Sequence, residues 1–131
     1  MEQHKIDLAK YRLEKSKEHL KSAEDLLKNG HLRDSISRAY YAIFTTARAI
    51  LGLRELDSKK HSGVIALFNQ HFVKTGILSV TASKIIQEAK SYREKADYED
   101  FFIINQEEAK KQFENAISFI EEVERKVDEL I

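Results

Sequence analysis

The 131-residue chain contains no proline, no cysteine and no tryptophan, and it has only four glycines. Because proline and glycine are the residues that most often interrupt helices, this sequence leaves little to interrupt them. Without cysteine the protein can have no disulfide framework and no thiolate metal site, which is typical of a cytoplasmic protein, and we expect that localisation. The length is that of one domain, so a single domain over residues 1–131 is expected.

Long apolar runs are also missing. No stretch approaches the ~18 consecutive apolar residues that a membrane-spanning helix needs. The N-terminal residues, MEQHKID, lack the apolar core of a signal peptide. The sequence therefore predicts no membrane association.

The familiar enzyme and metal motifs are absent as well. None of the five histidines stands four residues from another, and the Glu-x-x-His pattern of di-iron helical bundles does not occur. There is no glycine-rich phosphate loop and no Gly-x-Ser-x-Gly motif. We therefore expect neither a metal site nor a cofactor.

Neither sign of charge is in excess, since 22 lysines and arginines balance 22 aspartates and glutamates. The distribution is nevertheless uneven. Residues 31–98 carry eleven basic and six acidic side chains, a net charge of +5, whereas residues 99–131 carry four and ten, a net charge of −6. The positive middle indicates an anionic ligand near the middle helices, or two helices that attract each other across the fold. Charge alone leaves both interpretations open.

Apolar residues recur at alternating steps of three and four along most of the chain, which predicts amphipathic helices. Asn105 and Glu108 have the spacing of a capping box at the start of the last one. Four long helices and one short one, joined by brief loops, predict an all-α fold, an antiparallel four- to five-helix bundle. The expected helices are about 4–28, 32–52, 62–74, 79–96 and 106–130.

Four consecutive large apolar residues, Phe101 to Ile104, lie between the last two expected helices. Such a run needs burial. It either caps the end of the bundle or forms part of a dimer contact.

Tyr40 and Tyr41 are neighbours, and neighbouring side chains on a helix diverge by roughly 100°. Tyr40 falls on the apolar stripe and is expected in the core. Tyr41 falls on a second stripe, which it shares with Arg38, Thr45 and Arg48 at spacings of three, four and three.

This second stripe has two interpretations. The guanidinium groups of Arg38 and Arg48 suit phosphate, and the ring or hydroxyl of Tyr41 suits a nucleotide, so the stripe could be an anion- or nucleotide-binding surface. Alternatively it is a solvated face on which Asp34 and Arg38 form an i,i+4 ion pair, worth only a few tenths of a kcal/mol.

A second group of polar residues ends the fourth expected helix. Arg93 and Asp97 are four residues apart and can pair on one face, and Tyr98 begins the exit turn. This group could be a structural lock, or a site that offers a cation, a carboxylate and a phenol. No strong general base is present at neutral pH, because an Asp97 paired with Arg93 stays ionised and is a weak base.

Four motifs, in order, resemble the HEPN domain. They are SRAYYAIF at 37–44, KHSGVIALF at 60–68, FVKTG at 72–76 and REKADY at 93–98. The match is to the small stand-alone prokaryotic branch of the family, whose members are uncharacterised, and it covers about residues 5–128.

The resemblance implies a helical bundle that forms a homodimer, with the 93–98 motif near a cleft on the two-fold axis. It also implies a minimal nucleotidyltransferase as partner, frequently in a toxin–antitoxin pair. Catalytic members of the family are metal-independent ribonucleases that carry an arginine and a histidine separated by four to six residues. Arg93 matches the arginine, but Tyr98, Glu99 and Asp100 occupy the three positions where the histidine would stand.

Three functions therefore remain open. The leading hypothesis is a non-catalytic or weakly catalytic protein that binds a nucleotide or RNA and partners a nucleotidyltransferase. Its expected ligand-binding residues are Arg38, Tyr41, Arg48, His61 and Arg93. The second is an RNA-cleaving toxin that uses Arg93 with Asp97 or Tyr98, or takes an imidazole from His61. The third is a structural dimerisation module. The missing histidine favours binding over cutting, because imidazole is the side chain that moves protons near pH 7.

Overall fold

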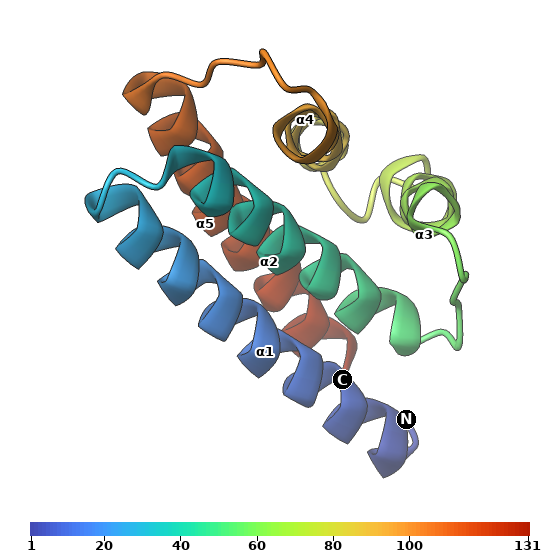
Figure 1. The fold of residues 1–131 in the computed structure, drawn as a ribbon. Helices are drawn as coiled ribbons and strands as arrows, with labels where there is room; N and C mark the ends of the chain where they lie inside the picture. The colour runs from blue at the N-terminus through green and yellow to red at the C-terminus, as the bar shows by residue number, and fades with distance from the viewer.

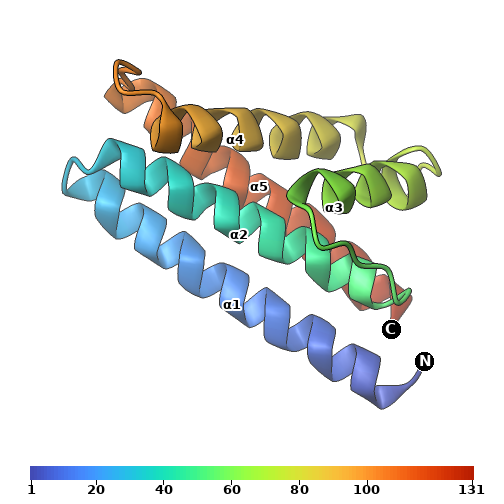
Figure 2. The same ribbon diagram turned by 45° about the vertical axis from the view of Figure 1, so that its right-hand side comes forward.

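A computed structural model describes residues 1–131, and every regular element in it is helical. The predicted all-α bundle is therefore confirmed. The helices α1, α2 and α5 run side by side, while α4 and α3 are steeply inclined to them, so that Figure 1 shows these two nearly end-on and Figure 2 shows α4 crossing over the layer. The elements are α1 (Gln3–Lys28), α2 (Leu32–Gly52), α3 (His61–Phe68), a π-helical turn η1 (Asn69–Val73), α4 (Val80–Tyr98) and α5 (Gln106–Leu130).

The helix ends lie where local chemistry places them. Gly30 follows α1 with φ of 78°, a left-handed conformation that favours glycine. At the start of α5 the predicted capping box is confirmed: the Asn105 side chain accepts from the Glu108 N–H at 2.8 Å, and the Glu108 side chain accepts from the Asn105 N–H at 3.4 Å. None of the helices is long and apolar enough to cross a bilayer.

Helix α2 is the centre of the molecule and contacts the four other α-helices. It is accordingly buried around most of its circumference rather than along one stripe. Tyr40 is fully buried, as the sequence predicted, beside Ile36 and Ile43. The buried hydroxyls have partners, since Ser35 donates to the Ala23 carbonyl at 2.8 Å.

The third predicted helix differs from expectation in two ways. It begins at His61 rather than after it, and at Asn69 it widens into a π-helical turn, in which Lys74 N–H bonds to the Asn69 carbonyl at 2.8 Å. Over so short a segment, apolar spacing does not distinguish a π turn from an α turn. Both Phe68 and Phe72 are fully buried.

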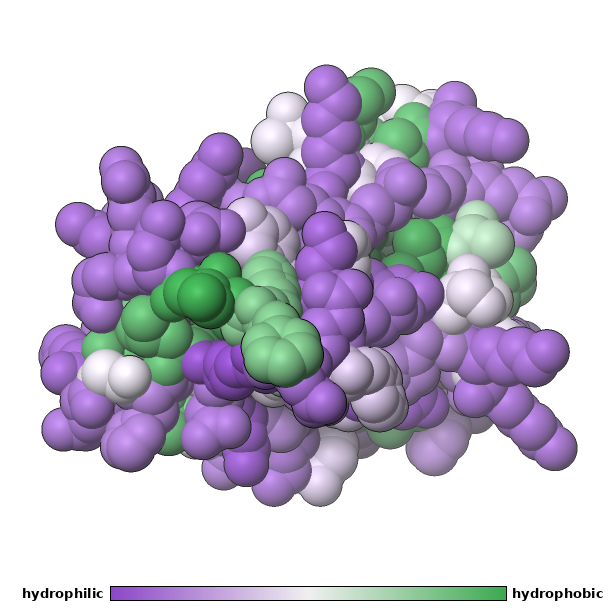
Figure 3. Space-filling model, turned by 45° about the horizontal axis from the view of Figure 1, so that its top comes forward, coloured by the Kyte–Doolittle hydropathy of each residue, from purple (hydrophilic) through white to green (hydrophobic).

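The apolar run between α4 and α5 is only partly buried. Ile104 is buried and Phe102 is half-buried in the small cluster at this end of the bundle, whereas Phe101 and Ile103 are 95% and 87% exposed. The face that carries this loop shows an apolar patch in otherwise mostly hydrophilic surroundings (Figure 3). Alternate residues therefore cap the bundle, and the dimer contact stays a prediction for the others.

Candidate functional site

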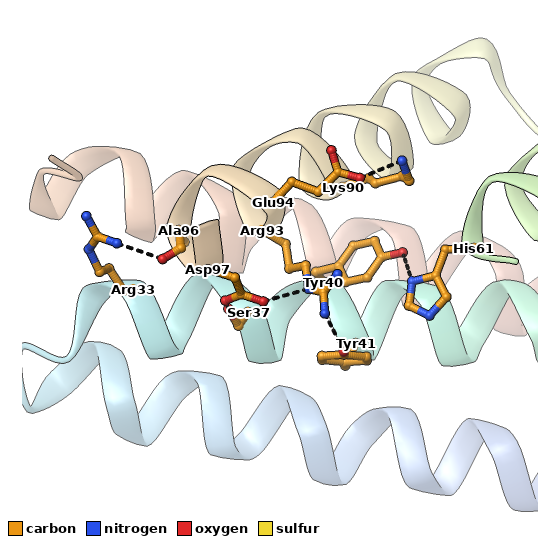
Figure 4. Close-up of polar contacts among 10 residues, drawn as sticks. All are labelled: Arg33, Ser37, Tyr40, Tyr41, His61, Lys90, Arg93, Glu94, Ala96 and Asp97. Atoms are coloured by element: carbon orange, nitrogen blue, oxygen red, sulfur yellow. Dashed lines mark hydrogen bonds and ion pairs between the residues drawn. The ribbon is translucent and has the colours of Figure 1, made fainter. Parts of the chain in front are cut away.

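The guanidinium of Arg93, on the last third of α4, lies among three tyrosine rings. Its Cζ is 5.4 Å from the ring centroid of Tyr41, 5.8 Å from that of Tyr40 and 5.9 Å from that of Tyr98. These distances are within the ~6 Å at which a ring face attracts a cation. Two of the rings come from α2 and the third, that of Tyr98, from the end of α4. The site therefore forms where α4 crosses α2, and Figure 4 shows Arg93 beside the two rings of α2.

Polar contacts fix Arg93 against α2. Its Nη2 donates to the Tyr41 hydroxyl at 2.9 Å, and Ser37 Oγ donates to Asp97 Oδ1, also at 2.9 Å. The Arg93 Nε lies 2.9 Å from Asp97 Oδ2, an ion pair in which the N–H is poorly aligned, so the buried Nε makes no hydrogen bond. Burial disfavours the charged guanidinium, but the surrounding phenol and carboxylate groups outweigh it, and the pKa of Arg93 is raised.

Arg93 is also accessible from outside. It lines an open surface hollow of about 510 Å³ together with Ser91, Glu94, Lys95, Tyr98 and Glu99. Tyr98 is 73% exposed, so its hydroxyl is available to a ligand at this rim. A cation that is held by neighbours and still borders solvent can receive an anionic group.

His61, at the first position of α3, joins the same cluster from the other side. Its Nδ1 lies 2.9 Å from the Tyr40 hydroxyl, and its ring stacks on Phe44 with centroids 4.1 Å apart. Tyr40 is buried, and burial raises its pKa, so the phenol stays protonated. The buried hydroxyl has no other acceptor among the hydrogen bonds of the structure, so we assign it as the donor to Nδ1, which puts the hydrogen of the neutral imidazole on Nε2.

The surroundings of His61 disfavour its protonation. Burial lowers the pKa of His61, and the positive charges of Arg93, Lys90 and Arg48 lower it further, whereas Glu94 opposes them. The imidazole is therefore neutral at physiological pH, in a tautomer whose outward nitrogen is a hydrogen-bond donor.

Arg33, near the start of α2, holds the loop that leads away from the site. Its Nη1 donates to the Ala96 carbonyl at 2.6 Å, and its Nη2 donates to the carbonyls of Glu99 and Phe102. These carbonyls belong to the last turn of α4 and the loop after it, where a helix leaves acceptors without partners. Arg33 thus fixes the end of α4 that carries Asp97 and Tyr98.

The structure brings some of the predicted site residues together and separates others. Arg93, Asp97, Tyr98, Tyr41 and His61 lie in one cluster, as the contacts above show. Two remaining arginines of the predicted stripe have other partners. The Arg38 guanidinium contacts His19 on α1 at 3.2 Å, and the ion pair expected between Asp34 and Arg38 does not form. The Arg48 Nη2 lies 3.4 Å from Asp57.

The stripe of α2 that faces α3 and α4 is therefore shifted from the predicted one. It includes Arg33, Ser37, Tyr41, Phe44 and Arg48, at spacings of four, four, three and four. The predicted stripe was built on the arginine Arg38, and it therefore left out Arg33, Ser37 and Phe44. The regular helical spacing from Tyr41 back to Ser37 and Arg33 is the signal that could have found them.

The basic middle of the chain makes no direct ion pair with its acidic C-terminal part. No ion pair joins a cation of residues 31–98 to an acid of residues 99–131, and the pair that ties α5 to another helix is Lys17–Glu124, from α1. Both interpretations of the charge asymmetry, an anionic ligand and a longer-range attraction between two helices, stay predictions. The structure also contains no group of three or more acidic or histidine side chains placed to hold a metal ion.

Comparison with known proteins gives a consistent result. The family model of the HEPN domain matches residues 9–126. A UPF0332 protein of Thermotoga maritima is 32% identical over 126 residues, which cover 96% of each chain. The Methanocaldococcus jannaschii protein MJ0605, named as a candidate toxin, is 35% identical over 91% of this chain and 88% of its own. The UPF0332 protein PH1297 of Pyrococcus horikoshii is 49% identical over 76 residues. That match covers 58% of this chain and about half (54%) of the relative's length.

Proposed function

The chain belongs to the HEPN domain family, and from that premise we propose that it is the nucleotide- or RNA-binding member of a toxin–antitoxin-like module, with little or no catalytic activity of its own. The observation that carries the proposal is the setting of Arg93, a cation among three tyrosine rings at the edge of a solvent-filled hollow. Guanidinium groups recognise phosphate, and the exposed ring of Tyr98 can stack on a base, so the pair of features suits a nucleic-acid ligand.

The same cluster lacks the groups that cutting RNA would require. Metal-independent cleavage needs a general base and an acid near neutral pH. Asp97 is engaged by Arg93 and Ser37, and the lone pair of His61 Nδ1 is engaged by Tyr40. The free nitrogen of His61 carries a hydrogen, so the neutral ring cannot accept a proton there. We therefore place binding ahead of cleavage, and the ribonuclease alternative is tested directly below.

The toxin–antitoxin assignment is a proposal that draws on the relatives. MJ0605 carries the name of a candidate toxin, and its match covers nearly the whole of both chains. We propose in addition that the partner is a minimal nucleotidyltransferase and that the functional unit is a homodimer. The first test is whether the neighbouring reading frame encodes a minimal nucleotidyltransferase. Co-expression of the two products, followed by affinity purification, then tests the partner; recovery of this chain alone would exclude it.

The binding proposal is tested by fluorescence anisotropy with a labelled single-stranded oligouridylate at low salt. We expect the wild type to bind, with an affinity that falls as salt rises because phosphate contacts release counterions. Arg93→Gln should weaken binding about tenfold or more, since it removes a charged contact. Arg125→Gln is the matched control, an equal change at an exposed arginine on α5. If both variants bind like the wild type, Arg93 is not the ligand contact.

A further inference from the structure

A second hollow lies next to the Arg93 site, on the other side of His61. It has a volume of about 370 Å³ and lies between the C-terminal half of α2, the connector to α3 and the first residue of α3. We call it the Arg48 hollow; its lining residues are Phe44, Arg48, Asp57, Ser58, Lys59 and His61. This volume is within the range of about 300–1,000 Å³ that small-ligand sites occupy.

Positive charge exceeds negative charge around this hollow. Arg48 and Lys59 line it, and Asp57 is the acid among the lining residues. Asp57 holds Arg48 only weakly, with Nη2 and Oδ2 3.4 Å apart and both side chains partly exposed, and the Arg48 Nε has no partner. Arg12, on α1, donates from Nη1 to the Arg48 carbonyl at 3.0 Å but does not itself line the hollow. An anion in the hollow would be attracted by this local excess of cations.

His61 adds a donor with a fixed direction. The ring is held on one edge by the Tyr40 hydroxyl and on one face by Phe44, so it has little freedom to turn. With Nδ1 bonded to Tyr40, the second ring nitrogen lies on the side away from Tyr40 (Figure 4), and we assign the imidazole hydrogen to it. His61 is one of the residues that line the Arg48 hollow, so we infer that its second ring nitrogen is the donor available to a ligand oxygen there.

We propose that the Arg48 hollow is a second phosphate subsite, which holds one phosphate of a single-stranded nucleic acid while Arg93 holds another. The inference rests on the proposed function, because it assumes that the ligand at Arg93 is a nucleic acid. Tyr41, the hydrogen-bond partner of Arg93, lies on α2, and Arg48 lies seven residues further along the same helix. The helical rise separates Tyr41 from Arg48 by about 10 Å.

This separation selects the class of ligand. The phosphates of a nucleoside triphosphate follow one another through single bridging oxygens and remain closer together than two helical turns. A mononucleotide therefore fills one subsite, whereas two phosphates of one strand, separated by an intervening phosphate, can fill both. The His61 cluster lies between the two subsites, and its aromatic groups there are Tyr40, Tyr41 and Phe44.

The first experiment measures strand binding. Anisotropy titrations use the labelled oligouridylate and, as competitor, uridine monophosphate. Arg48→Gln should weaken oligouridylate binding about tenfold and reduce the salt dependence by about 0.7 in the slope of log K against log salt, the value for one phosphate contact on a single strand. Lys59→Gln, at an exposed residue, should act in the same direction, and Arg125→Gln should bind like the wild type.

The second experiment probes the hollow with inorganic phosphate alone. In the nitrogen-15 spectrum of the histidine side chains, phosphate should shift the His61 signals saturably in the wild type. It should shift them much less in Arg48→Gln, and His31 provides the internal control.

The outcomes separate the two proposals. If the strand binds through Arg93 while Arg48→Gln and Lys59→Gln match the control, the subsite is overturned and the proposed function stands. If the strand fails to bind but phosphate still shifts His61 in an Arg48-dependent way, the phosphate site stands and the nucleic-acid function falls. Uridine monophosphate that competes as tightly as the strand, or a His61 signal that ignores phosphate, would overturn the subsite proposal.

Discussion

Arg93 Nη2 donates a 2.9 Å hydrogen bond to the Tyr41 hydroxyl, although the two residues lie on different helices and 52 positions apart in the sequence. The bond joins α4 to α2 at the candidate site. It also orients the guanidinium among the tyrosine rings, so the same contact serves the fold and the site.

Replacing Tyr41 with phenylalanine tests the structural part of this contact. The change keeps the ring and removes the acceptor for Arg93, whose side chain is only 18% exposed. We expect the free energy of unfolding in urea to fall by about 1–2 kcal/mol, the cost of leaving a charged donor without its partner. Tyr11→Phe is the matched control at an exposed tyrosine of α1. Equal stabilities of the two variants would show that the bond contributes nothing.

His61 should make the protein less stable in mild acid. Its pKa in the folded state is lowered by burial and by neighbouring cations, so the unfolded chain binds the proton more readily. This contribution to the free energy of unfolding is fully present when the pH is above the ordinary histidine pKa of about 6.5. It is lost as the pH falls from there towards the lower pKa of His61 in the folded state. The pKa of His19 is lowered too, by burial and by Arg38, and adds to the effect.

Urea denaturation at several pH values between 7 and 5 measures this dependence. His61→Gln should lose less stability over that interval than the wild type does. His4→Gln, at an exposed residue, should follow the wild type. A His61→Gln variant with the wild-type pH dependence would contradict the assignment.

Arg33 should be important for the end of α4. Arg33→Gln removes a guanidinium that donates to three backbone carbonyls. We expect a loss of about 2 kcal/mol in the free energy of unfolding, because these acceptors depend on a charged donor. Faster amide hydrogen exchange should follow in residues 96–104, while the α1–α2 interface keeps its protection. Unchanged exchange in residues 96–104 would refute the role.

The proposed homodimer can be tested at the exposed loop. A Phe101→Ser, Ile103→Ser double variant removes two large apolar side chains that contribute little to the core. We expect light scattering after size exclusion to shift from dimer towards monomer, with the melting temperature of the monomer preserved. Val80→Ser, at an exposed apolar residue of α4, should leave the mass unchanged. A wild-type mass for the double variant would place the dimer contact elsewhere.

Much of the fold could be predicted from the sequence, because it depends on local chemistry. Helical apolar spacing without proline located the five helices, and the Asn105–Glu108 spacing located a cap. Spacing within one helix also placed Tyr40 in the core and Tyr41 on a second face. These properties require no knowledge of how helices cross.

The site could be predicted only in part, because it depends on where α4 and α3 cross α2. Periodicity on α2 defines several stripes but does not say which of them packs against α4. The prediction therefore placed Arg38 at the site, whereas Ser37 is the residue that contacts α4. His61 and Tyr40 are 21 positions apart and are brought together by the loop between α2 and α3. Helical periodicity does not predict the course of a loop, so the sequence pattern does not predict this contact. The π-helical turn after Phe68 likewise leaves no distinct spacing.

We propose that the Arg93 site binds RNA without cutting it. The most direct measurement is one titration in which a labelled oligouridylate is followed by anisotropy and then resolved on a denaturing gel, without added metal. We predict that the wild type binds the strand and returns it intact, and that Arg93→Gln fails to bind. Fragments that form with the wild type and disappear with Arg93→Gln would contradict the account and make the protein a ribonuclease.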